Sequence, residues 1–524
     1  MTRSALLAAA LATALAVLTT PALASGTASA SGTASASIPG AAAGTVSAHT
    51  SGRASAVASV SASARADCST AAGPADFNGD GLTDAVTGDP FADLDGIEGA
   101  GIVQVLLGGK TEEAPDGLPG AGGTLELRSP NPEPGDGFGW AVRTAHVNDD
   151  KCLDVIVGAP YTGETDTGAA YVFFGTASGD SEVLPLDTDK QPEAHFGWSL
   201  AAADLTGGGA IVAVGEPHAD EPADAGAVHI FDLDGTIRST KRLTQENEGV
   251  IGNGEVGDMW GWSLAIGNLG GDSDKPDLVV GAPYENNDGT GIQVASGKID
   301  SGMVAVIFDI LEKGPYTSRK WDLNQATKEV VEKSGNRFGW SLAYAEWGNT
   351  GYLAVSTPLA DQGDIADTGA IQLFERKGSG ELAPYRTIRM GVGELRFPTI
   401  PVVKGAAIGW SMAFLNPRGT PVIAIGEPFA STTEARETGR VRFAPVRGGE
   451  NGDGLDFPDP QPYQHFGWSL AAYGNPNGLT PGQGLVIGIP DRKGGGAVAT
   501  RAQGPATLIK TTRKGTTDLG RSVG

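Results

Sequence analysis

Oxygen-bearing side chains recur at short, regular spacing in one stretch of the chain, and they suit a calcium ion. Between residues 76 and 84 the alternate positions carry Asp76, Asn78, Asp80 and Asp84, and Leu82 offers a main-chain carbonyl. Calcium takes about six to eight oxygen ligands, and alternating Asp and Asn residues on a tight, glycine-containing turn point theirs inward. The alternative is a turn rich in Asp and Asn that holds no metal. We predict a calcium loop.

The elements around this loop are predicted to be β-strands. An EF-hand loop ends on an acid at about its twelfth position and continues into a helix. Here the last acid, Asp84, stands at the ninth position, and a short apolar run follows it at once. We therefore expect the loop to join two strands.

Three markers recur along the chain, which indicates a repeat architecture. The first is a Gly-x-Pro triplet that ends an apolar run, spaced on average about 67 residues apart; its copies begin at Gly88, Gly158, Gly215, Gly281, Ser356, Gly426 and Gly488. The second reads Phe-Gly-Trp-Ser or a close variant and lies upstream of a triplet; its copies begin at Phe138, Phe196, Trp260, Phe338, Ile408 and Phe466. The third is a glycine before an alternating strand, at Gly101, Gly168, Gly226, Gly302, Gly369, Gly439 and Gly496.

Each repeat offers about four short strands between turns of Gly, Pro and Asp, without a sustained helical period. Seven such units predict an all-β fold, a seven-bladed β-propeller of four-stranded antiparallel blades. The first triplet has no Phe-Gly copy upstream of it, and the missing copy appears at the other end of the chain as Leu519-Gly520-Arg521-Ser522. We therefore predict that the C-terminal strand closes the ring beside Asp76.

The Phe-Gly and Gly-Ala-Pro markers, from about residue 74 to residue 524, resemble the FG-GAP repeats of the integrin α-subunit propeller and of exported bacterial proteins built from the same repeat. This resemblance implies a seven-bladed propeller in which calcium loops join the first two strands of some blades and brace the ring. It also implies that loops on the opposite face meet partners.

The other repeats depart from that calcium pattern. Unit two carries Asn148, Asp150 and Asp154, but His146 and Lys151 stand where the first acid and a glycine are expected. Unit four is irregular, with Asp272, Asp274 and Asp277; the remaining units place Ile211, Tyr352, Val422 and Gly484 at the last ligand position. We predict a second, weaker calcium loop in unit two, leave unit four open between a metal site and a plain turn, and expect no metal in the others.

Composition predicts an exported protein. Residues 1–24 combine a basic start, an apolar run and Ala22-Leu-Ala24, which predicts a signal peptide. Residues 25–65 are almost only small residues and predict a low-complexity linker or propeptide. Residues 66–524 would form the propeller, and no stretch there is long enough to span a membrane. The formal net charge of −25 argues against nucleic-acid binding.

The chain has two cysteines, Cys68 and Cys152, and each lies near an acidic loop of neighbouring repeats. An even count in an exported protein predicts a disulfide between them.

Aromatic and histidine residues also recur in register. The tryptophans of the second marker are Trp140, Trp198, Trp262, Trp340, Trp410 and Trp468. A sugar-stacking ring is one interpretation, but the shared register favours packing between blades. His195 and His465 each precede a marker phenylalanine, and we interpret them as polar turn residues rather than catalytic ones.

The sequence supports three functional hypotheses. The first is a secreted, calcium-binding, monomeric propeller that binds an extracellular protein or glycan without catalysis, through acidic loops that follow the triplets (residues 91–99, 161–167, 218–225, 284–301, 359–368 and 429–438). The alternative is an extracellular hydrolase or lyase acting on a polysaccharide or other polymer, because acids are plentiful and a carboxylate pair would suffice. The third is a scaffold without a specific ligand. No residue is assigned a catalytic role.

Overall fold

The structure is a computed structural model. It describes residue 68 and residues 75–111, 117–176, 180–220, 222–270, 275–286, 298–390, 402–416, 421–433, 435–448, 453–474, 484–501, 505–509 and 516–524. The predicted signal peptide and linker, and the unit-four residues Asp272 and Asp274, lie outside the described residues.

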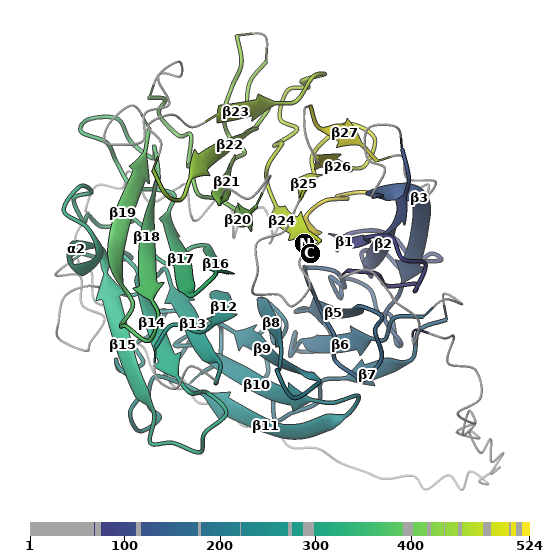
Figure 1. The fold of residues 1–524 in the computed structure, drawn as a ribbon, viewed down its shortest axis with the longest axis horizontal. Coiled ribbons are helices and arrows are strands. Elements are labelled where there is room, and N and C mark those ends of the chain that lie inside the picture. The colour runs from purple at the N-terminus through teal and green to yellow at the C-terminus, as the bar shows by residue number, and fades with distance from the viewer. Residues whose placement is uncertain are drawn as a thin grey trace, which may run out of the picture. The chain divides into compact units, whose positions relative to one another are not determined.

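Seven four-stranded antiparallel sheets surround a common axis, as Figure 1 shows. Blade 1 contains β28 (Ser522–Val523), β1 (Ala85–Asp89), β2 (Ile102–Gly109) and β3 (Leu118–Leu127). Blade 2 contains β4 (Ala141–Ala145), β5 (Asp154–Ala159), β6 (Ala169–Phe173) and β7 (Val183–Pro185). Blade 3 contains β8 (Leu200–Asp204), β9 (Ala210–Glu216), β10 (Ala227–Leu233) and β11 (Ile237–Leu243). Blade 4 contains β12 (Ser263–Gly267), β13 (Asp277–Ala282), β14 (Met303–Phe308) and β15 (Thr317–Asp322).

Blades 5 to 7 repeat the same order from the axis outwards. Their strands are β16 (Leu342–Trp347), β17 (Thr350–Thr357), β18 (Ala370–Lys377), β19 (Ala383–Arg389); β20 (Met412–Leu415), β21 (Val422–Glu427), β22 (Arg440–Pro445), β23 (Asp453–Asp456); and β24 (Leu470–Tyr473), β25 (Gly484–Ile489), β26 (Ala497–Arg501), β27 (Thr507–Leu508). The predicted all-β, seven-bladed propeller is confirmed.

The C-terminal strand closes the ring, as predicted. Strand β28 pairs antiparallel with β1, placing Ser522 opposite Gly88 and Val523 opposite Thr87. Gly524 and Val86 exchange two main-chain hydrogen bonds of 3.0 and 3.1 Å. The innermost strand of blade 1 therefore comes from the far end of the chain.

The core is divided among the blade interfaces. Each pair of neighbouring blades encloses its own cluster of buried apolar side chains. The first residue of each second marker lies in one of these clusters: Phe138, Phe196, Trp260, Phe338, Ile408, Phe466 and Leu519. The marker thus supplies the apolar plug between its own blade and the preceding one, and burial of that side chain holds the two together.

The markers also make the polar joint between blades. In blade 3 the N–H of the marker residue Gly197 donates to the carbonyl of the triplet residue Gly215 at 3.1 Å. The hydroxyl of Ser199 donates to the carbonyl of Gly261, in the next blade's marker, at 2.6 Å. The Gly261 carbonyl lies against Gly215, where a Cβ atom would come within 2.2 Å of its oxygen. The small residues of the markers are therefore required by the close approach of two backbones.

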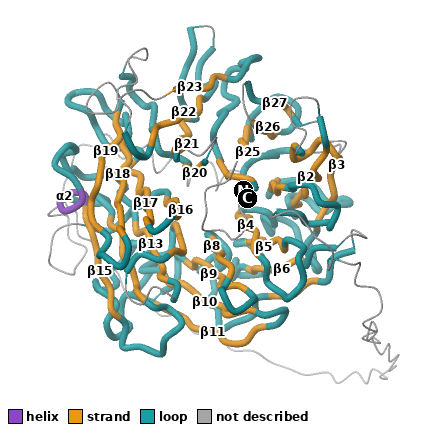
Figure 2. The backbone as a smooth tube through the Cα atoms, in the orientation of Figure 1, coloured by secondary structure: helices purple, strands orange, loops and turns teal. Residues whose placement is uncertain are grey.

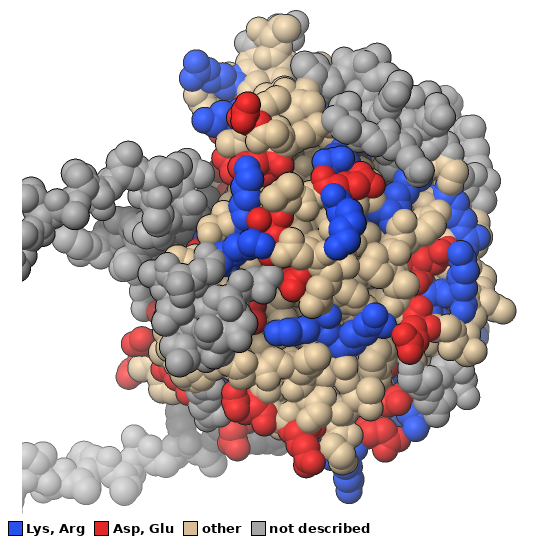
Figure 3. Space-filling view, turned by 90° about the vertical axis from the view of Figure 1, so that its left-hand side faces the viewer, with Lys and Arg blue, Asp and Glu red and all other residues tan. Residues whose placement is uncertain are grey.

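Loops and turns, teal in Figure 2, connect the strands within and between the blades. Among the described residues the α-helix is a single turn, α2 (Leu323–Ala326), which begins after Asp322, whose carboxylate accepts the N–H of Gln325 at 2.8 Å. On the flank that carries β15 and β19, basic and acidic side chains alternate (Figure 3). Arg319 pairs there with Glu381, and Lys333 pairs with Asp361. This mixed surface is not a continuous basic stripe of the kind that binds phosphates.

Candidate functional site

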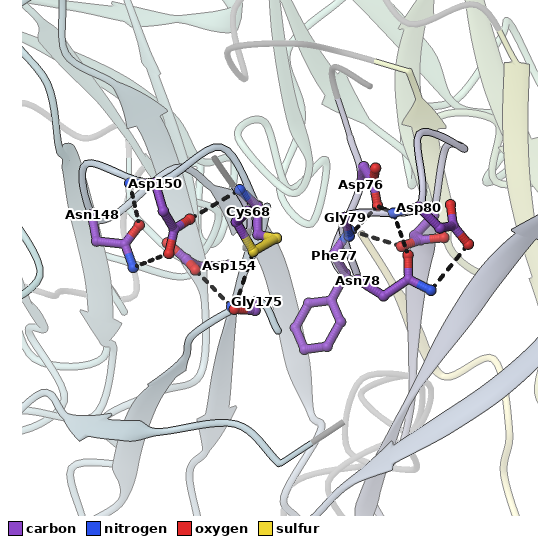
Figure 4. Close-up of a disulfide and its surroundings, with 12 residues drawn as sticks. Cys68, Asp76, Phe77, Asn78, Gly79, Asp80, Asn148, Asp150, Asp154 and Gly175 are labelled. Carbon is purple, nitrogen blue, oxygen red and sulfur yellow. Dashed lines mark hydrogen bonds between the residues drawn. A yellow bond between two sulfur atoms is a disulfide. The ribbon is translucent and has the colours of Figure 1, made fainter. Parts of the chain in front are cut away.

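The predicted first calcium loop wraps its main chain around one carboxylate. Asp76 is fully buried, and it accepts N–H groups from Gly79 at 2.7 Å, Asp80 at 3.2 Å and Gly81 at 2.6 Å. Asp80 in turn accepts the N–H of Leu82 at 2.8 Å. Figure 4 shows Asp76, Asn78 and Asp80 drawn together by these bonds. The alternating acids and glycines therefore build a tight turn around the buried Asp76 carboxylate, with Asp80 exposed at its rim.

The last acid of the loop fastens it to the sheet. The two carboxylate oxygens of Asp84 accept the N–H of Phe77 at 2.7 Å and of Gly108 at 2.6 Å. Asp154 in blade 2 accepts two main-chain N–H groups in the same way, and Asp277 in blade 4 accepts three. Burial raises the pKa of Asp84 to about 7, and the charges of Asp76 and Asp80 add to the rise. The three acids repel one another, and a bound cation would relieve this repulsion.

The donor set of the first loop fits a hard cation. It consists of oxygens alone, from Asp76, Asn78, Asp80 and Asp84, and these are the ligands that calcium prefers. Each carboxylate oxygen has two lone pairs, so the two Asp84 oxygens, which accept one N–H each, keep a second lone pair for a ligand. Asp84 would serve both as a ligand and as the anchor to β2.

The blade 2 loop differs from the first loop at its opening position. His146 stands there; its main-chain N–H donates to one oxygen of Asp204 at 2.8 Å, and its Nδ1 lies 2.8 Å from the other. The hydrogen bond to Asp204 raises the pKa of His146. Asn148, Asp150 and Asp154 keep their places, with Asp150 accepting the N–H of Cys152 at 2.9 Å. A cross-blade contact to β8 thus replaces the first ligand of the predicted site.

The structure joins Cys68 and Cys152 in a disulfide with Cα atoms 5.4 Å apart. The bond lies between the two loops (Figure 4). The N–H of Leu153 also donates to the carbonyl of Asp76 at 2.8 Å. Within the described part of the chain, one group of three His, Cys, Asp or Glu side chains has its ligand atoms close together. It consists of Cys68, Asp150 and Cys152. Both sulfurs are bonded to each other, so this group holds no metal.

A cavity of about 180 Å³ lies along the axis. Its walls are mostly apolar side chains of the innermost strands, and its polar lining includes Asp84, Arg143, His146 and Asp204. Arg143 donates to the carbonyl of Val142 at 2.7 Å and forms no ion pair with any acid that the structure describes. Desolvation by the surrounding ring lowers the pKa of Arg143, although its side chain is exposed to the cavity. The sequence analysis did not identify Arg143 and Asp204 as cavity residues. The available signal was that successive side chains of each innermost strand point to opposite faces of the blade.

The marker tryptophans form a ring around the axis. Successive indoles lie 4.9–5.1 Å apart, and their planes differ by 45–54°. This angle is close to the rotation of about 51° between blades of a seven-fold ring. Arg521 takes the seventh position, 4.3 Å from the Trp468 ring and 5.8 Å from the Trp140 ring. All six indoles are half-buried, so the ring joins the blades yet keeps edges in contact with solvent.

The histidines that precede the marker phenylalanines have different environments. His465 Nδ1 lies 2.6 Å from Asp491 and its Nε2 lies 3.3 Å from Glu437. His195 packs against Tyr161 and His218 with ring centroids 5.1 and 4.7 Å away. Burial lowers the pKa of His195 to about 4, and the neighbouring His218 adds to the fall. His195 therefore behaves as a neutral packing group, whereas His465 is held by two acids.

Comparison with known proteins matches residues 138–173 to the FG-GAP repeat. Human phosphatidylinositol-glycan-specific phospholipase D is 31% identical over 243 residues, which are 42% of this chain and 26% of the human protein. Mouse integrin alpha-7 is 32% identical over 151 residues, which are 28% of this chain and 12% of the mouse protein. The matched part of the chain thus spans about a quarter of the phospholipase and less of the integrin. No helix in the described ranges has the length and apolar character needed to cross a membrane.

Proposed function

The chain is a seven-bladed propeller built from FG-GAP repeats, and from that premise we propose that it is an exported, calcium-stabilised module that binds an extracellular protein or glycan without catalysis. One observation carries the proposal. Two proteins with different names, an integrin subunit and a phospholipase, share this type of segment. The matched part is about an eighth of the integrin and about a quarter of the phospholipase. A segment shared in this way supports a role in binding more than a role in any one reaction.

The face for this binding is the one that carries the tryptophan ring. The loops after the triplets leave the second strand of each blade there, opposite the calcium loops, because successive antiparallel strands reverse direction. The first residues of several of these loops extend the aromatic surface: Phe91, Tyr161, Tyr284 and Phe429 each contact a ring tryptophan. Half-buried aromatic rings within polar loops are typical of protein and glycan recognition.

Calcium has a structural role in this proposal. An ion on Asp76, Asn78, Asp80 and Asp84, with the carbonyl of Leu82, would hold the first loop in the turn that anchors it to β2. The weaker site on Asn148, Asp150 and Asp154 would act likewise in blade 2. An ion that binds the folded state alone stabilises it by about 2.7 kcal/mol at a hundred-fold excess over its dissociation constant.

Thermal unfolding of the mature protein in chelator and in calcium tests this role. We expect calcium to raise the melting temperature and the change of Asp76→Asn with Asp80→Asn to reduce that rise. The control is Asp187→Asn with Asp189→Asn, an equal change of charge at two exposed positions outside the loop. An equal calcium response in the loop variant and in the control variant would refute the calcium loop.

Binding is tested by passing cell-surface and secreted extracts, and separately a glycan array, over the immobilised mature protein. Variants in the aromatic surface, such as Trp410→Ala and Phe429→Ala, are compared with wild type. A species retained by wild type and lost with these variants supports the proposed face. If no species is retained from any source while calcium still stabilises the protein, the binding role is wrong and calcium serves the fold alone.

A second candidate is a hydrolase or lyase acting on an extracellular polymer. Two acids, Asp84 and Asp204, line the axial cavity beside His146, and phospholipases are among the relatives. The candidate ranks below binding because both carboxylates already hold loop backbone in place. Release of reducing ends from polysaccharides that is lost in Asp204→Asn, with an unchanged melting temperature, would move our preference to this function.

A further inference from the structure

Blade 4 carries an acid at each of two repeat positions where the other blades do not have a pair of acids. Asp258 lies two residues before the marker residue Trp260, and Glu285 lies two residues after the triplet proline. The residues at the same two positions are Asp136 and Thr162 in blade 2, Ala194 and Ala219 in blade 3, Asn336 and Ala360 in blade 5, Ala406 and Ala430 in blade 6, and Gln464 and Arg492 in blade 7. In blade 7 this pair is a hydrogen bond, since Arg492 donates to Gln464 Oε1 at 2.6 Å. Blade 4 instead brings two carboxyl groups together.

Both acids of blade 4 are removed from solvent. Asp258 is 0% exposed and Glu285 is 7% exposed. One oxygen of Asp258 accepts the N–H of Glu255 at 2.8 Å. The other oxygen, Asp258 Oδ1, and Glu285 Oε2 accept no well-formed hydrogen bond from the described residues. The two carboxyls lie close enough for one to donate to the other when it is protonated. Burial raises the pKa of both carboxyls. Buried carboxylates of this kind require a compensating charge or proton.

A neutral side chain from the neighbouring blade, that of Gln245, lies beside Glu285. Gln245 follows β11 of blade 3 and is 3% exposed. It lies close enough to Glu285 to lower the pKa of that carboxyl through hydrogen bonding. In the described part of the chain, neither its Oε1 nor its Nε2 atom has a partner of good hydrogen-bond geometry. A buried amide beside Glu285 whose polar atoms make no well-formed hydrogen bond leaves donors and acceptors for a ligand.

The local positive charge is small. Lys320 Nζ lies 4.0 Å from Glu285 Oε1, beyond hydrogen-bonding distance, and its side chain is partly exposed. The charge of Glu255 raises the pKa of both Asp258 and Glu285. One distant ammonium group does not balance several buried carboxyls at this blade interface.

We propose that Asp258, Glu285 and Gln245 bind a divalent cation between blades 3 and 4, separately from the calcium loops. Two carboxylates would balance the charge of the ion, and the amide oxygen would supply a third ligand from the other blade. All three donors are oxygens, so the site selects a hard cation, and calcium suits a buried site of irregular geometry better than magnesium does. The ion would cross-link two blades on the face that carries the tryptophan ring.

The test counts bound calcium ions by equilibrium dialysis on the mature protein with the Asp76→Asn, Asp80→Asn background, which removes the first loop. Calcium chloride alone is the probe. We expect Asp258→Asn to bind one ion fewer than its parent and to lose part of the remaining rise in melting temperature. Asn336 already makes the same turn bond in blade 5, where it accepts the N–H of Lys333, so an asparagine side chain in place of Asp258 keeps the local turn.

The matched control is Asp136→Asn. Asp136 accepts the N–H of Glu133 at 2.7 Å, just as Asp258 accepts that of Glu255, but the position equivalent to Glu285 is Thr162 in its blade and carries no acid. This control should leave the ion count unchanged, and Glu285→Gln should lose the same ion as Asp258→Asn. An unchanged count in Asp258→Asn, with higher stability in chelator, would overturn the proposal, because the two acids would then share a proton. An equal loss in the control would also overturn it.

Discussion

At the scale of single residues, the glycine of each triplet decides how closely two blades approach. A Cβ atom on Gly158 would lie 2.1 Å from the carbonyl oxygen of Gly197, in the next blade. In blade 5 the equivalent residue is Ser356, and there a Cβ on Gly409 would meet the Cβ of Ser356 at 2.9 Å. The recurring glycine is therefore a packing requirement between blades rather than a turn signal alone.

Replacing Gly215 with alanine is predicted to destabilise the ring by more than about 2 kcal/mol, because the methyl group would clash with the Gly261 carbonyl and with Ser199. The control is Gly207→Ala, where a Cβ meets no atom within 4 Å and φ is not positive. Urea unfolding of both variants measures the difference. Equal stability of the two variants would contradict this account of the blade joint.

The neutral state of His195 predicts a pH dependence. Its pKa is about 4 in the folded protein and about 6.5 in the unfolded chain. The unfolded state therefore binds more protons between these values, and stability falls as pH drops from about 6.5 to about 4. Its surroundings include His218, Asp224 and Tyr161. We expect His195→Phe to reduce this loss, as measured by unfolding free energies at pH 7 and pH 4.5. A constant difference between wild type and variant would show that His195 does not titrate as described.

At the scale of elements, the C-terminal segment locks the ring. Besides the pairing of β28 with β1, Thr517 and Asp518 donate main-chain N–H groups to Asp89 at 2.9 and 3.0 Å. Ser522 donates its hydroxyl to the Gly139 carbonyl at 2.7 Å, and Arg521 completes the tryptophan ring. These contacts join the last residues of the chain to blades 1 and 2, so the segment fastens the two ends of the ring together.

Deletion of residues 517–524 is predicted to lower the melting temperature strongly, because blade 1 loses its innermost strand and exposes the cluster around Leu519 and Val523. Ser522→Ala removes one hydroxyl bond from the same joint and should cost about 1 kcal/mol. Differential scanning fluorimetry compares the two. A deletion no worse than the single substitution would show that the ring does not depend on this closure.

The disulfide acts on a second element, the segment before β1. It ties Cys68 to the blade 2 loop, while the Asp76 carbonyl bonds to Leu153 beside it. Replacing both cysteines with serine is predicted to cost about 2–4 kcal/mol. Reduction of wild type should produce a similar fall in melting temperature and leave the double variant unchanged. A wild-type melting temperature that does not respond to reductant would contradict the prediction.

At the scale of the whole molecule, the propeller is a ring of similar interfaces with a few local exceptions. Ordinary interfaces combine an apolar plug, a glycine contact and a serine bond. The exceptions are the acidic loop before blade 1, which we predict to bind calcium, the disulfide between the first two loops and the acid pair of blade 4. Such exceptions are where ligands and specific functions are expected on a repeated scaffold. Calcium removal should therefore loosen particular blade interfaces rather than all of them equally.

Hydrogen exchange measures that expectation. We predict that chelation speeds exchange in the loops before β1 and β5 and leaves the joint of blades 5 and 6 unchanged, because the proposed ligands in the first two blades lose their ion. Faster exchange throughout the ring would indicate instead that calcium controls closure as a whole.

The sequence by itself determined the repeat, the number of blades, the closure by the C-terminus and the residues of the first acidic loop. These features follow from local spacing, since strand alternation, turn glycines and loop acids act over a few residues. Only the tertiary structure decided what meets across the blades. It brought Asp204 to His146, stacked Arg521 on Trp468, and placed Asp258 beside Glu285. Such contacts depend on how seven units turn about one axis, and nothing in the spacing along a single repeat encodes the neighbour that a side chain will meet.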